Sequence, residues 1–159
     1  MDYSRIKGPV FAALLSILAA TAHGIRVSPA VFTARNVPMG EDIPLGIELR
    51  VYNPGGDTLK CKIERREAPE KSLPGYAPIS EPGFIYIAGD SELIVPPESS
   101  ASRMIRANIP DREEFYNRFW EVDFAVTGGE GMFRTGAVTR YFIETPPVRS
   151  HEPIAGEII

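Results

Sequence analysis

The sequence predicts an antiparallel β-sandwich, a fold of two packed sheets, in a chain of 159 residues. The first observation is alternation, because every second residue from Ile43 to Val51 is apolar and most of the residues between them are polar or small. Successive side chains of a strand point to opposite faces, so this segment has one apolar face that a second sheet must cover. The second observation is spacing: seven or eight short strands are separated by turns rich in glycine and proline, with at most one helical turn. This spacing is typical of an immunoglobulin-like sandwich.

Residues 43–63 are expected to form the central hairpin of the fold. The alternation stops at the turn-forming residues 53–57 and resumes with Leu59, Cys61 and Ile63 on the apolar face. Cys61 is the only cysteine, so an internal disulfide is impossible and the residue is expected to be a small buried hydrophobe.

The remaining strands are expected at residues 25–32, 84–88, 92–95, 103–109, 119–127 and 133–145. Pro29 confines the first of them to a sheet edge or forces it to change sheets. In the strand 119–127, Trp120 is expected to be the central core side chain and Glu121 to face solvent. The proline-rich segment 68–83 is expected to be a solvated loop, with a binding loop as the alternative.

The N-terminus predicts export. Arg5 and Lys7 precede a short apolar run that ends in Ala20-Thr21-Ala22, the small-x-small form cleaved by signal peptidase. We therefore expect a signal peptide at 1–22, a sandwich domain at 23–145, a tail at 146–159, and a periplasmic or secreted location. An uncleaved anchor is the alternative, but a spanning helix needs about 20 apolar residues.

Composition and motifs argue against several classes of function. The net charge of −4 and the lack of a basic run give no reason to expect a nucleic-acid partner. The sequence has no phosphate-binding glycine loop, no Gly-x-Ser-x-Gly elbow and no HExxH motif, so no enzyme is expected. The acidic cluster at residues 111–114 is interpreted as the cap of one helical turn.

Several motifs occur in an order that resembles a broad family. A first strand with a proline, a strand ending in Asn53-Pro54-Gly55, the segment Leu-Ile-Val-Pro-Pro and a later Trp-Glu-Val resemble the immunoglobulin-like domains of the pilus-chaperone and major-sperm-protein type over residues 25–145. The resemblance implies a non-enzymatic domain that pairs with extended peptide segments. It also implies that Arg26 and Arg140 bind a partner's terminal carboxylate, although the family has a lysine at the second position. The alternative is that both arginines are ordinary outward-facing charges.

The last strand is the candidate binding edge. Residues 136–143 are free of proline and have two partly apolar faces. If one face serves the core, Val138 and Phe142 on the other remain free to meet a protein partner by strand addition. The alternative is a central strand covered on both sides.

A second hypothesis concerns copper. Cleavage after residue 22 makes His23 the first residue, and a free amine with an imidazole can chelate copper. The turn before the last strand holds Met132 where copper-binding sandwiches carry a histidine, and the other histidine is His151 in the tail. A small periplasmic copper-binding sandwich is therefore the alternative function, whereas the main hypothesis needs no cofactor.

Overall fold

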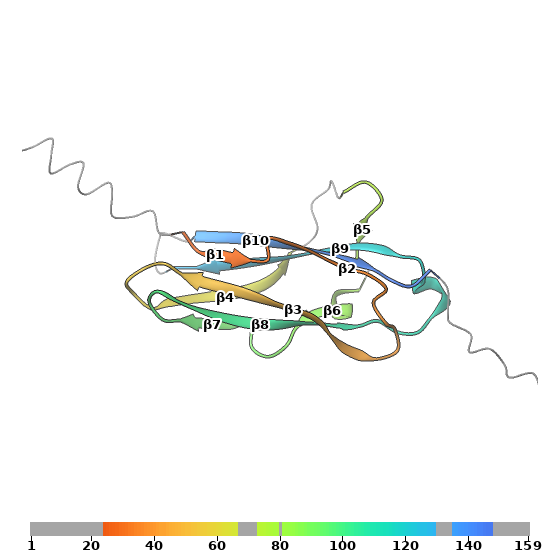
Figure 1. Cartoon of the computed structure of the whole chain (residues 1–159), viewed down its shortest axis with the longest axis horizontal. Helices are drawn as coiled ribbons and strands as arrows, with labels where there is room; N and C mark the ends of the chain where they lie inside the picture. The colour runs from red at the N-terminus through yellow and green to blue at the C-terminus, as the bar shows by residue number, and fades with distance from the viewer. Residues whose placement is uncertain (1–23, 67–72, 80, 130–134, 148–159) are drawn as a thin grey trace, which may run out of the picture.

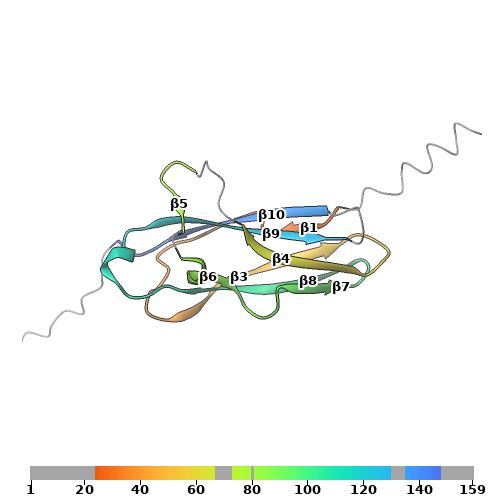
Figure 2. The ribbon, with the colours of Figure 1, turned by 180° about the vertical axis from the view of Figure 1, so that it is seen from behind.

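A computed structural model describes residues 24–66, 73–79, 81–129 and 135–147, which form two stacked sheets (Figures 1 and 2). The predicted immunoglobulin-like sandwich is confirmed. The expected signal peptide, His23, Met132, His151 and most of the expected tail lie outside the described residues. Within the described residues, no helix has the length and apolar character needed to cross a membrane.

The two sheets contain ten strands, whereas seven or eight were expected. The four-stranded sheet has the order β1 (Arg26–Ser28), β3 (Asp42–Asn53), β8 (Ser99–Asn108) and β6 (Ile85–Ile87). The six-stranded sheet has the order β2 (Val31–Ala34), β10 (Thr135–Glu144), β9 (Phe119–Gly128), β4 (Leu59–Arg66) and β7 (Glu92–Val95), with β5 (Ala77–Pro78) also paired to β9. Two short 3-10 helices, η1 (Pro82–Phe84) and η2 (Glu113–Phe115), lie between strands. η2 lies where one helical turn was expected, but the expected cap is wrong, because no side chain caps η2 and Asp111 accepts a hydrogen bond from Tyr116 instead.

The first strand changes sheets at Pro29, as its sequence predicted. Before the proline, β1 pairs antiparallel with β3, and after it β2 pairs parallel with β10. The extra strands arise partly from this division and partly from β5, which lies in the segment expected to be a loop. Because one strand serves two sheets, it covers only part of each sheet edge.

The expected hairpin at 43–63 is wrong. β3 and β4 lie in different sheets, where β3 pairs with β1 and β8 and β4 pairs with β9 and β7. Their apolar faces therefore lie in the two facing layers of the core. Alternation reports which face of a strand is buried, but it is the same for strands that lie side by side and for strands stacked face to face.

Asn53 fixes the crossing between the two sheets. Its side-chain amide donates to the carbonyl oxygens of Asp57, Val95 and Pro96 at 2.7, 3.0 and 3.1 Å, and its oxygen accepts from Gly55 N at 2.9 Å. The residue is 5% exposed, so these bonds satisfy backbone groups that water reaches poorly.

We expect Asn53→Ala to lower the free energy of unfolding by about 2 kcal/mol, because it leaves buried carbonyl groups without donors. Urea denaturation measures the change. Asn108→Ala, at an exposed position on β8, is the matched control and should change stability by less than about 0.5 kcal/mol. Equal midpoints for the two variants would contradict this role of Asn53.

The centre of the core is aromatic. Phe124 and Tyr141 are the largest side chains that are fully buried, and their rings meet edge to face with centroids 5.7 Å apart. Trp120 is buried as expected, but it packs with Phe84 and Phe115 from the two 3-10 helices and so closes one end of the core. Cys61 is buried as predicted, and burial raises the pKa of its thiol.

The segment 73–79 packs on the outer face of the six-stranded sheet. Ile79 is 5% exposed, and β5 pairs with Trp120 and Glu121 of β9. Tyr76 and Ile79 thus dock on the sandwich, but the other residues from Leu73 to Pro78 are exposed, so the expectation of a solvated segment holds for most of the described part. The expected exposure of Glu121 is wrong, since its side chain is 0% exposed and accepts a hydrogen bond from Leu73 N at 3.4 Å.

Candidate binding edge

The first half of β10 is open on one side. β9 pairs with β10 along its whole length, but on the other side β2 reaches only Arg140 to Ile143. The N–H of Arg140 donates to Ala30 O at 3.0 Å, on the β2 side. Because the backbone groups of successive residues point to alternate sides, Gly136 and Val138 direct their N–H and C=O groups to that same side, where no described strand pairs with them.

The corresponding open stretch of the other sheet is protected. β1 pairs only with Arg50 to Tyr52 of β3. The uncovered part of β3 contains Pro44, which has no N–H, and a register shift between Pro44 and Glu48 around Gly46, whose φ is +74°. Proline, bulges and charged residues are the features that prevent edge-to-edge pairing. Residues 136–139 of β10 are Gly-Ala-Val-Thr and have none of them.

Apolar side chains flank the open half of β10 on both faces. On the outer face Val138 is 39% exposed, as the sequence predicted, and Val31 of β2 is 59% exposed. On the inner face, Ile25 and Val27 near β10 are only partly buried against the core. A strand added here would cover apolar surface on each of its faces.

Phe142 is not available to a partner. Its side chain is 4% exposed, and the ring of Tyr76 lies over it with centroids 4.6 Å apart. Tyr76 also donates a hydrogen bond from its hydroxyl to Glu144 Oε1 at 2.6 Å. The expectation that Phe142 is free is therefore wrong, because residues 73–79 cover the second half of β10. The pattern of apolar residues within β10 cannot reveal that cover, because the covering ring comes from a distant part of the sequence.

Arg140 forms ion pairs with two carboxylates of its own chain. Its Nε lies 2.7 Å from Glu121 Oε1, and its Nε and Nη2 donate to Asp123 at 3.0 and 3.2 Å. The carboxylate side chains are 0% and 4% exposed, against 33% for the guanidinium. The hydrogen bond to Asp123 raises the pKa of Arg140. The sequence does not predict this ion cluster, because Glu121 alternates with core residues and is therefore expected to face solvent.

Arg26 is exposed on the outer face of the other sheet. Its guanidinium lies 5.9 Å from the centroid of the Tyr52 ring, on the strand that pairs with β1. Arg140 points to the outer face of the six-stranded sheet. The structure therefore places the two arginines on opposite outer faces and does not join them into one carboxylate-binding site.

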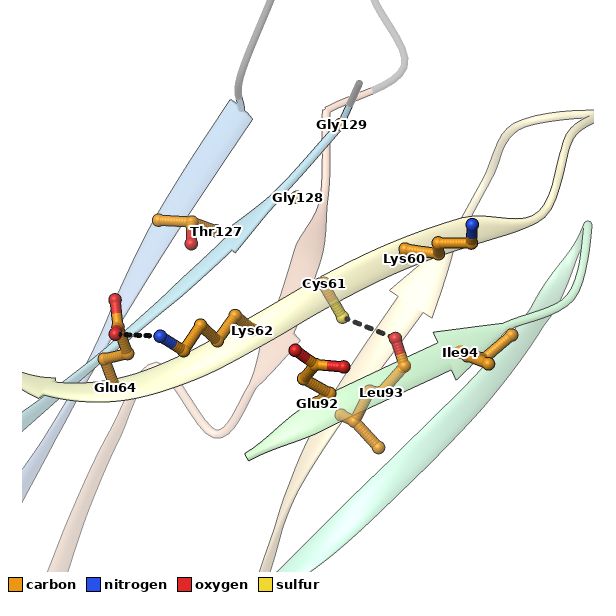
Figure 3. A pocket seen from close by; sticks show the side chains of 10 residues that line it. All are labelled: Lys60, Cys61, Lys62, Glu64, Glu92, Leu93, Ile94, Thr127, Gly128 and Gly129. Atoms are coloured by element: carbon orange, nitrogen blue, oxygen red, sulfur yellow. Dashed lines mark hydrogen bonds and ion pairs between the residues drawn. The ribbon is translucent and has the colours of Figure 1, made fainter. Parts of the chain in front are cut away.

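A groove of about 620 Å³ lies on the outer face of the six-stranded sheet, lined by β4, β7 and β9 (Figure 3). Lys62 and Glu64 form an ion pair at 2.6 Å on one side, and Ile94 is 67% exposed on the other. Thr127 lines the groove and pairs with Gly136, so the groove ends beside the open half of β10. Its charges are of both signs and favour no ionic ligand.

The copper hypothesis falls on residues that are not described, because His23 and His151 lie outside them. Among the described residues, no group of three or more His, Cys, Asp or Glu side chains is placed to hold a metal ion.

Solved structures share this fold at low sequence identity. The PapD-like domain 7 of human CEP192 aligns with a TM-score of 0.59 at 10% identity, over 94% of this chain and 99% of that one. The E. coli chaperone DraB aligns with a TM-score of 0.54 at 12% identity, over 80% of this chain and 58% of that one. The YadV chaperone gives 0.52 at 9% identity, over 82% and 55%. The chain thus spans little more than half the length of these two chaperones.

No protein-family model matches the sequence, and no curated protein sequence matches it. The similarity is therefore one of fold. It confirms the expected resemblance in fold: the chain has an immunoglobulin-like sandwich fold similar to that of the PapD-like domain of CEP192 and of the DraB chaperone.

Proposed function

We propose that this chain is a non-enzymatic, extracytoplasmic binding or assembly module that pairs with an extended segment of a protein partner along the open half of β10. The observation that carries the proposal is the contrast between the two open edges. The uncovered part of β3 contains a proline, a bulge and charged residues, whereas Gly136 to Val138 of β10 has none of these and its outward backbone groups pair with no described strand.

The residues along this edge indicate how an added strand would bind and which side chains it would carry. Gly136 and Val138 supply the hydrogen-bonding groups, and covering the Val138 side chain contributes about 1.5 kcal/mol. The partner side chain that points to the inner face would meet Val27 and Ala137. We therefore expect this partner residue to be uncharged and apolar. The extracytoplasmic location rests on the predicted signal peptide.

A site-specific photo-crosslinker tests the edge. With benzoyl-phenylalanine in place of Val138, we expect adducts with extracytoplasmic proteins in which mass spectrometry maps the linked residue to an extended apolar segment. The matched control carries the same group in place of Ile94, which is more exposed and lies on the opposite edge strand β7 of the same sheet. Adducts of equal yield and identity at both positions would rule out the β10 edge as the binding surface.

The backbone contribution is tested by Val138→Pro, which removes one outward N–H and leaves the pairing with β9 intact. We expect it to abolish the adducts formed from a crosslinker at Val31, with a folded circular dichroism spectrum. Retained adducts in the folded variant would contradict strand addition at this edge.

A further inference from the structure

One side of the sandwich contains two strand edges that lie close together. β7 is the last strand of the six-stranded sheet, so no described strand pairs with its outer edge. In the other sheet β6 pairs only with Ile105 to Ala107 of β8, and no described strand pairs with Ser99 to Arg103 on that side. β7 lies beside β8 (Figures 1 and 2). This side is therefore a second place where another chain could add a strand.

The outer edge of β7 presents backbone groups of every second residue. Ile63 N donates to Ser91 O at 2.8 Å, so Ser91, the residue before β7, directs its backbone groups to β4. Because successive residues of a strand direct these groups to opposite sides, Glu92 and Ile94 direct theirs away from β4.

The uncovered half of β8 presents a carbonyl group on the same side of the sandwich. Ala88 N donates to Met104 O at 2.9 Å, so Met104 directs its carbonyl to the side of β6. By the same alternation, Ser102 directs its carbonyl to this side, beyond the end of β6.

The side chain of Arg103 bonds to the outward carbonyls of both edges. Arg103 lies on the inner face of β8, since it pairs with the fully buried Leu49 of β3. Its Nη2 donates to Glu92 O at 2.9 Å, its Nη1 to Ser102 O at 3.1 Å, and its Nε to Asp90 O at 2.9 Å. The guanidinium thus lies where an added strand would need to bond, and an inward-pointing charge is a feature that prevents edge-to-edge pairing.

We propose that Arg103 closes this side of the sandwich to other strands, so that the chain binds one partner segment at a time, through the open half of β10. The proposal rests on the proposed function, because it concerns how many segments the module binds. A module with one open edge ends an assembly at the segment that it binds, whereas two open edges would link such modules into longer chains.

Arg103→Met tests the closure, because methionine is unbranched and apolar and has no donor. The bonds to Asp90 and Glu92 are exposed, so water can replace the guanidinium in the folded variant. With benzoyl-phenylalanine in place of Ile94, we expect the purified Arg103→Met chain to form covalent dimers, which the wild-type chain with the same group does not form. The matched control is Arg50→Met, because Arg50 lies on the exposed outer face of the same sheet and pairs with Glu48.

A circular dichroism spectrum checks that the variants are folded. Arg103→Lys is the second variant, since it keeps the charge but has one nitrogen in place of three, and we expect a smaller gain of dimers from it. Equal dimer yields from the wild-type, Arg50→Met and Arg103→Met chains, or no dimers from either folded Arg103 variant, would overturn the proposal.

Capture of extracytoplasmic proteins separates this inference from the proposed function. In the wild-type chain we expect adducts from a crosslinker at Val138 and none from one at Ile94, and in Arg103→Met we expect adducts from both. Capture at Val138 without a gain at Ile94 in the variant would refute the closure by Arg103 and leave the proposed function standing. No capture at Val138 would refute the proposed function and the one-segment stoichiometry, and dimers gained at Ile94 would still support the closure.

Discussion

Trp120→Ala is expected to lower the free energy of unfolding by about 3–5 kcal/mol, because it removes a large side chain that is 6% exposed and leaves a cavity. The indole packs against Phe84 and Phe115, and these rings come from segments with little other regular structure. The loss should therefore also loosen the end of the sandwich that the two 3-10 helices close.

Chemical denaturation followed by circular dichroism measures this effect. Ile94→Ala is the control, since Ile94 is 67% exposed on the same sheet and its loss should cost less than about 0.5 kcal/mol. If the two variants unfold at the same denaturant concentration, Trp120 does not close the core as described.

Arg140→Ala should be destabilising by about 3–5 kcal/mol, because it leaves Glu121 and Asp123 buried without their counter-charge. Removal of one partner of a buried ion pair costs much more than the intact pair contributes, since the remaining charge keeps its desolvation penalty. This outcome would show that Arg140 serves the structure and is not a free carboxylate-binding residue.

The control for the Arg140→Ala variant is the same substitution at an arginine of the other sheet. Arg106 also donates to a carboxylate at 2.9 Å, but the Asp42 side chain is 45% exposed. Arg106→Ala should cost much less than Arg140→Ala, because solvent screens this exposed ion pair. A comparable loss from both variants in urea denaturation would show that burial of the Arg140 cluster does not determine its importance.

The tertiary structure alone decided which strands pair, and therefore where the candidate site lies. The alternation at 43–51 and 59–63 is compatible with a hairpin and with two strands in facing sheets. The second arrangement forms because β3 pairs with β1 and β8, whereas β4 pairs with β9 and β7. Likewise, a charged residue between two core residues predicts a solvent-facing position, but residues 73–79 cover Glu121 and make it a buried partner of Arg140. The same segment covers Phe142, so only Val138 of the two expected contact residues is exposed.

The sequence by itself determined the class of fold and the burial of Trp120 and Cys61, and it limited the strand at Pro29 to a sheet edge or a change of sheet. These features depend on a residue's own geometry and on the period of apolar side chains, which are local properties. Which half of β10 stays open was decided only by the folded chain. The backbone groups of Gly136 to Val138 resemble those of any strand in sequence; in the folded chain β2 pairs with Arg140 to Ile143, and no described strand pairs with the rest of that edge.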